Sequence, residues 1–134
     1  MSKKNVRWYK KKVKIGEKMD IMVRISKEKK EKDFRMVVIP SGRDKIGIIQ
    51  TKDYGIIAYP DKKDFEKIGE MINWAFNESD DKVIENTSDI KIEKQFYNCS
   101  SYRKVTNEYN EIWFEFFKGI YSISLLKKDG NFFV

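Results

Sequence analysis

Hydrophobic and polar residues alternate in the first part of the chain. In residues 20–26, Ile21, Val23 and Ile25 fall on one side of an extended chain, and Met22 and Arg24 fall on the other. This period of two is typical of a strand with one buried face. β-branched residues support four further strands, in residues 7–15, 34–39, 46–49 and 55–59. Short connections between them favour an antiparallel β-meander of about five strands.

The period changes after residue 60. Apolar residues then recur at helical spacing, at Phe65, Ile68, Ile72, Ala75 and Phe76. This stripe predicts one long amphipathic helix over residues 61–77, packed on a face of the sheet. Asp61 is the expected N-cap, because its carboxylate can accept a hydrogen bond from a free N–H of the first turn.

The second half of the chain returns to strand-like patterns. A polar loop over residues 78–89 precedes three or four strands, expected in residues 90–96, 111–117, 120–126 and 132–134. Residues 100–110 fit either a short helix or a long loop. The whole pattern predicts a single α+β domain over residues 1–134.

Charge is unevenly distributed. The net charge is +7, and residues 1–63 contain 19 lysines and arginines against 8 acidic residues. Such an excess favours an anionic partner. The alternative is a compositional bias towards lysine with no function attached.

Several kinds of chemistry are excluded by composition. The chain has no histidine and one cysteine, Cys99, so a histidine-dependent nucleophile or a thiolate zinc cluster cannot form. No phosphate-binding glycine motif occurs, and no cofactor is expected. Asp61, Asp89 and Lys91 match on paper the Pro-Asp and Asp-x-Lys layout of a metal-dependent nuclease superfamily, but Asp61 also fits a helix cap. The chain is therefore expected to be non-enzymatic, with the nuclease as an open alternative.

A basic, aromatic-bearing stripe is the strongest positive signal. In a strand over residues 7–15, alternation places Trp8, Lys10, Lys12 and Lys14 on one face. Lysines that follow phosphates and a ring that stacks on a base are features of single-strand binding. The predicted nucleic-acid surface comprises Arg7, Trp8, Lys10, Lys12, Lys14, Arg24, Arg35, Arg43 and Lys45. The alternative is that Trp8 closes the core while the lysines protect an edge strand.

Aromatic residues near the end of the sequence favour a second kind of surface. If Ile112, Phe114 and Phe116 face the core, Trp113 and Phe117 face away from it. Trp113, Phe117 and Tyr121 then form a candidate protein interface, unless both faces of the sheet are covered.

Two functions follow from these surfaces. The first hypothesis is a module that binds single-stranded nucleic acid, and the element order is similar to that of small single-strand-binding folds such as the Whirly and PUR-type domains. The alternative is a small bacterial or phage inhibitor or immunity-type protein that docks one protein partner. No signal peptide or membrane span is recognisable, so a cytoplasmic protein is expected.

Overall fold

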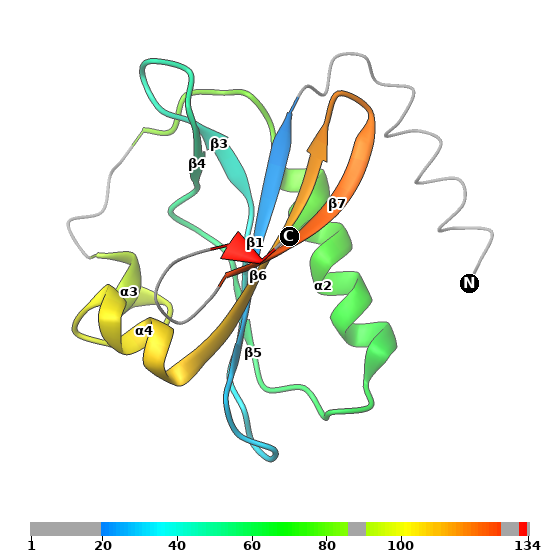
Figure 1. Ribbon diagram of the computed structural model, residues 1–134, viewed down its shortest axis with the longest axis vertical. Coiled ribbons are helices and arrows are strands. Elements are labelled where there is room, and N and C mark those ends of the chain that lie inside the picture. Colours follow the sequence, from blue (N-terminus) through cyan, green and yellow to red (C-terminus); the bar gives the residue numbers. More distant parts are fainter. Residues whose placement is uncertain (1–19, 86–90, 127–131, 134) are drawn as a thin grey trace.

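The computed structural model describes residues 20–85, 91–126 and 132–133, and they form a main sheet, a small second sheet and three helices (Figure 1). The main sheet has the strand order β5-β2-β1-β6-β7-β8, with every pair antiparallel. Its strands are β1 (Ile21–Glu28), β2 (Met36–Ile39), β5 (Ile56–Ala58), β6 (Tyr109–Phe117), β7 (Ile120–Leu126) and β8 (Phe132–Phe133). Strand β1 is central because it pairs with β2 on one side and with β6 on the other.

The second sheet is a hairpin of β3 (Ser41–Arg43) and β4 (Ile49–Thr51). Buried Pro40 separates β3 from β2, since proline has no N–H to donate to a strand ladder. The chain then returns to the main sheet, where β5 pairs with β2. The strands therefore do not all pair in sequence order.

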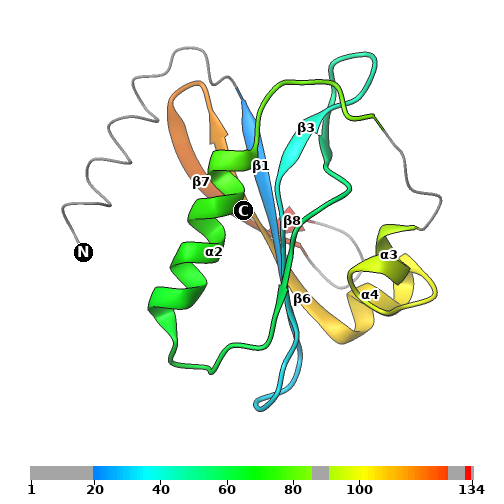
Figure 2. The ribbon, with the colours of Figure 1, turned by 180° about the vertical axis from the view of Figure 1, so that it is seen from behind.

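Helix α2 (Phe65–Glu78) lies across one face of the main sheet (Figure 2). The helix starts four residues later than predicted, and its N-cap is Asp64, whose side chain accepts a hydrogen bond from the Lys67 N–H. The predicted cap was wrong, because the carbonyl of Asp61 instead accepts a bond from the Asp64 N–H in the turn before the helix. Phe65 was also misplaced in the predicted stripe, because it stands on the first helical residue and is 75% exposed.

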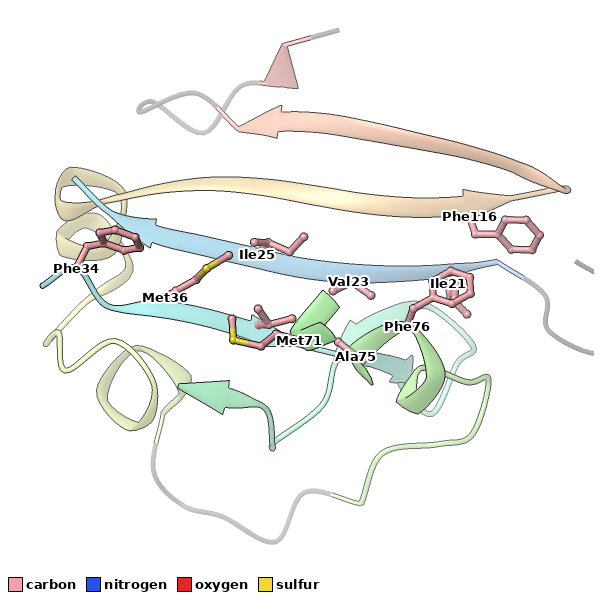
Figure 3. Packing of buried hydrophobic residues seen from close by; sticks show 10 residues of the cluster. Ile21, Val23, Ile25, Phe34, Met36, Met71, Ala75, Phe76 and Phe116 are labelled. Carbon is pink, nitrogen blue, oxygen red and sulfur yellow. The ribbon is translucent and has the colours of Figure 1, made fainter. Parts of the chain in front are cut away.

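The first hydrophobic cluster lies between α2 and the sheet (Figure 3). The predicted alternation in β1 is confirmed, since Ile21, Val23 and Ile25 all point into this cluster, but the other side of residues 21–26 is buried as well. Helix α2 contributes Met71, Ala75 and Phe76. Burial of each large side chain of this kind stabilises the fold by roughly 1.5–3 kcal/mol.

Part of the other face of the sheet is covered by a second cluster around two short helices, α3 (Ile92–Gln95) and α4 (Tyr102–Glu108). Its buried members are Val37, Ile39, Phe96, Tyr97, Cys99, Val105 and Tyr109. The strand expected over residues 90–96 was wrong, because a helical turn allows Phe96 and its neighbour Tyr97 to enter the same cluster. Helix α4 accounts for most of residues 100–110, which the sequence left open.

The predicted α+β class and element order are confirmed. Five strands, β1 to β5, precede α2, and three strands end the described chain. The strand expected over residues 7–15 lies outside the described residues. None of the helices in the described ranges is long and apolar enough to cross a membrane.

Candidate functional site

A group of polar and aromatic side chains lies on the face of the main sheet opposite α2, which we call the second face. Register places Arg24 directly across from Trp113, and Ser26 directly across from Glu111. Side chains at opposed positions of an antiparallel pair lie on the same face, so these four meet. With two tyrosines they form the arginine cluster: Arg24, Ser26, Tyr97, Tyr102, Glu111 and Trp113.

Glu111 is the acceptor at the centre of this cluster. Arg24 donates through Nε to Glu111 Oε1 at 3.0 Å, and Trp113 donates through Nε1 to Glu111 Oε2 at 2.7 Å. The side chains of Arg24 and Glu111 are 10% and 6% exposed, so the ion pair is buried. Both carboxylate oxygens are thus occupied, and the indole of Trp113 is held in one orientation.

The guanidinium of Arg24 is only partly used. Its Nη2 is buried and has no hydrogen-bond partner among the described residues. The guanidinium carbon lies 5.0 Å from the ring centroid of Tyr97 and 5.8 Å from that of Tyr102, within the range of cation–π attraction. Burial acts to lower the pKa of Arg24, but its interactions with Tyr97 and Glu111 outweigh burial and raise that pKa. The group is therefore a permanent cation with a spare donor.

The two tyrosines differ in exposure. Tyr97 is 2% exposed, its hydroxyl shares a hydrogen bond of 2.8 Å with Ser26 Oγ, and burial raises its pKa to about 12. Tyr102 is 43% exposed and occupies the first position of α4, directly after the cap residue Ser101. The cluster therefore reaches the protein surface at Tyr102.

The second face continues along β6 and β7. Glu115 and Phe117 follow Trp113 at alternate positions and are half-buried. Ser124 of β7 donates to Glu115 at 2.8 Å. Around the arginine cluster, this face therefore combines aromatic and hydrogen-bonded polar groups.

The described members of the predicted nucleic-acid surface lie on or beside several different elements. Arg24 is buried against Glu111, whereas Arg35 donates to the Phe96 carbonyl and to the Tyr59 hydroxyl. Arg43 donates to the carbonyls of Asp20 and Gly42, and Lys45 is exposed between β3 and β4. Arg7, Trp8, Lys10, Lys12 and Lys14 lie outside the described residues. The three arginines of this predicted surface that the structure describes therefore donate to acceptors within the protein.

The positive charge is also divided between residues 1–19 and the rest of the chain. Residues 1–19 contain eight lysines and arginines and one acid, whereas residues 20–134 contain twenty of each. The whole net charge of +7 therefore resides in residues 1–19.

The residues predicted for a protein interface lie on two faces. Trp113 and Phe117 share the second face, as their alternation with Phe116 predicts. Tyr121 lies on the α2 side, where its ring centroid is 4.7 Å from that of Phe116. Sequence reasoning missed Glu111, Tyr97 and Tyr102. The available signal was Arg24 within the apolar run of residues 21–25, and Glu111 directly before the apolar residues 112–114.

The other candidates from the sequence were the thiol of Cys99 and the possible nuclease residues Asp61, Asp89 and Lys91. Cys99 is buried, its thiol donates to the Tyr97 carbonyl at 3.4 Å, and burial raises its pKa, all of which favour an unreactive thiol. Asp61 and Lys91 are exposed near the starts of α2 and α3, and Asp89 lies outside the described residues. No cluster of three or more metal-binding side chains occurs in the part of the chain that the structure describes.

Comparisons with protein-family models, curated proteins and solved structures find no match. The function is therefore argued from the arginine cluster and from the distribution of charge.

Proposed function

We propose that this protein is a non-enzymatic binding module that docks a protein partner on its second face, around Tyr102 and Trp113. The observation that carries the proposal is the composition of the arginine cluster. Arginine, tyrosine and tryptophan are the residues most enriched among those that dominate binding energy in protein interfaces. Here all three kinds are gathered around one buried ion pair, in a cluster that reaches the surface at Tyr102.

The geometry also favours a small entropic cost of binding. Trp113 is held by its hydrogen bond to Glu111, and the Ser101 cap fixes the backbone of the first turn of α4, which carries Tyr102. Side chains that are ordered before association lose less conformational freedom in the complex. An interface built on them needs little rearrangement of the sheet.

A matched pair of substitutions tests this proposal. Tyr102 and Phe65 are both exposed aromatic residues at the first position of a helix, directly after its cap. Aspartate is favourable near a helix N-terminus, so Tyr102→Asp and Phe65→Asp should both fold. A partner is captured from native cells with the wild-type chain, purified, and its affinity for each variant is measured by calorimetry.

We expect Tyr102→Asp to weaken binding of the partner by at least about tenfold, which corresponds to a loss of about 1.4 kcal/mol in binding free energy. Phe65→Asp should leave the affinity within about twofold of wild type, since scattered surface changes contribute little. Equal affinities of the two variants for every captured protein would reject the second face as the docking site.

A second candidate function is nucleic-acid binding through residues 1–19. The concentration of the entire net charge in this segment favours it, together with Trp8 among the lysines. Lysines there would neutralise phosphates, and an aromatic ring would stack on a base at about 1–3 kcal/mol.

This second function predicts a strong dependence on salt. Binding of a fluorescent 20-nucleotide single strand should weaken by at least about tenfold between 50 and 200 mM salt, because counterions are released on binding. The triple variant Trp8→Ala, Lys10→Gln, Lys12→Gln should lose the binding, and Tyr102→Asp should retain it. Affinity that is insensitive to salt would remove this candidate.

A further inference from the structure

Arg24 has an unused hydrogen-bond donor beside its ion pair with Glu111. A carboxylate commonly takes two parallel bonds from an arginine. In this protein the second oxygen of Glu111 accepts from Trp113, at 2.7 Å. Nε of Arg24 donates to the first oxygen of Glu111, and Nη2 is buried without a partner among the described residues. A buried donor in this state is unfavourable until an acceptor reaches it.

Tyr102 is the part of the cluster through which an acceptor can approach. Two rings flank the guanidinium, and Tyr97 is 2% exposed whereas Tyr102 is 43% exposed. The hydroxyl of Tyr102 makes no hydrogen bond within the described ranges of the chain. Rotation of this ring would therefore break no hydrogen bond, and it would open the side of Arg24 that faces solvent.

The guanidinium of Arg24 favours an acceptor with negative charge, because its hydrogen bonds to carboxylates are stronger than those to neutral acceptors. The charges that act on Tyr102 are the acids Glu111 and Glu93 and the cation Arg24. Glu111 is already hydrogen-bonded to Arg24, so Glu93 is the remaining acid that an incoming carboxylate would meet.

We propose that Nη2 of Arg24 receives a carboxylate oxygen from an aspartate or glutamate of the protein partner, with the ring of Tyr102 turned aside. This inference rests on the proposed function of the second face, and it adds the chemistry that the partner must present. Charge-assisted bonds to arginine are short and directional, so this contact would select partners as well as bind them.

The test uses the full-length chain as bait for a phage library of random 16-residue peptides. Three variants accompany the wild type. Arg24→Lys keeps the positive charge beside Glu111 but lacks the planar fork of donors. The double variant Arg24→Met, Glu111→Leu removes both charges together, which is usually tolerated in a buried site. Tyr102→Asp reports whether a selected peptide binds on the second face.

We expect the peptides selected by the wild type to share an acidic position and to lose binding to Tyr102→Asp. Replacement of that acid by its amide should weaken binding to the wild type by about 10- to 100-fold, the range for a hydrogen bond to a charged group. The same replacement should change binding to Arg24→Lys and to the double variant by less than about twofold.

The two proposals fail in different ways. Peptides that depend on Tyr102 but share no acid, or whose acid matters equally to the wild type and Arg24→Lys, would overturn the carboxylate contact and leave the docking face standing. Peptides that bind Tyr102→Asp normally, or a library that yields no binder, would overturn both.

Discussion

Glu111 receives hydrogen bonds from Arg24 and Trp113 and is itself almost completely buried. Residues 87 positions apart in the chain thereby join β1 to β6 on the second face. The attraction between two buried charges must offset the loss of their hydration, so the pair is worth little compared with apolar residues of the same size. Replacement of only one residue of the pair has a much larger effect on stability, because the remaining charge then has no partner.

We predict that Glu111→Gln lowers the free energy of unfolding by about 3–5 kcal/mol, because it leaves the Arg24 cation buried and uncompensated. Glu115→Gln is the matched control, since Glu115 lies four residues on, on the same face, and accepts from Ser124 alone among the described residues. The control should lose about 1 kcal/mol. Urea denaturation followed by circular dichroism measures both.

The double variant Arg24→Met, Glu111→Leu should recover wild-type stability or exceed it, since no lone charge remains. Similar losses for Glu111→Gln and Glu115→Gln would show instead that the Arg24 charge is reached by water in the native protein.

The raised pKa of Tyr97 predicts that the stability of the protein depends on pH. Burial raises its pKa to about 12, whereas an ordinary tyrosine titrates near 10.0. Between these values the unfolded chain loses the proton and the native state keeps it, so stability falls as the pH rises. The loss from one such tyrosine approaches about 1.4 kcal/mol per pH unit. Burial also raises the pKa of Tyr109, which adds to the loss.

Tyr97→Phe removes one of these titrating groups. The stability advantage of the wild type over Tyr97→Phe should therefore be smaller at pH 11 than at pH 8, in urea titrations at both values. Tyr59→Phe, at an exposed tyrosine, serves as the control. An advantage that stays constant over this range would mean that the hydroxyl of Tyr97 is ionised as easily in the folded protein as in the unfolded chain.

At the scale of the element, the start of α2 can be tested by two neighbouring aspartates. Asp64 accepts from the Lys67 N–H at 3.3 Å, whereas Asp61 contributes only its backbone carbonyl to the preceding turn. Asp64→Ala should therefore cost about 1 kcal/mol, and Asp61→Ala should stay within about 0.5 kcal/mol of wild type. The measurement is thermal unfolding, and a larger loss for Asp61→Ala would place the cap at the residue favoured by the sequence alone.

The same helix shows what a sequence pattern can and cannot predict. Helical spacing correctly identified Ala75 and Phe76 as buried, because their neighbours on the sheet are apolar strands. It also included Phe65, which has the right spacing but stands on the first helical residue and is exposed. Local periodicity predicts which face of the helix a side chain lies on. It does not predict whether another element covers that part of the face.

The arginine cluster was outside the reach of local patterns for a related reason. Alternation correctly placed Arg24 on the face of β1 that points away from the first cluster. From this position, Arg24 was expected to be an exposed cation that binds nucleic acid. Whether such a side chain meets water or Glu111 depends on the pairing of β1 with β6, and on the helices that cover the second face. Those are contacts between distant segments, which no window of sequence contains.

At the scale of the whole molecule, the two hydrophobic clusters share one sheet. Alternate residues of β2 serve both, since Met36 and Val38 point to α2 while Val37 and Ile39 point to the second face. Loss of either layer would expose the apolar residues that it covers on these strands, and disruption of the strands would break contacts in both clusters. The clusters should therefore unfold together, as expected of a single cooperative unit.

Two tryptophans report on the two sides of the sheet. Trp74 packs against the first cluster from α2, and Trp113 lies on the second face. In single-tryptophan variants made with Trp8→Phe and either Trp113→Phe or Trp74→Phe, the urea midpoint from fluorescence should equal the midpoint from far-ultraviolet circular dichroism of the same variant. Comparison within one variant removes the stability effect of the substitution itself. If the Trp113 signal changed at a lower urea concentration than the dichroism, the second face would open before the α2 layer. The arginine cluster would then belong to a separately folding part of the protein.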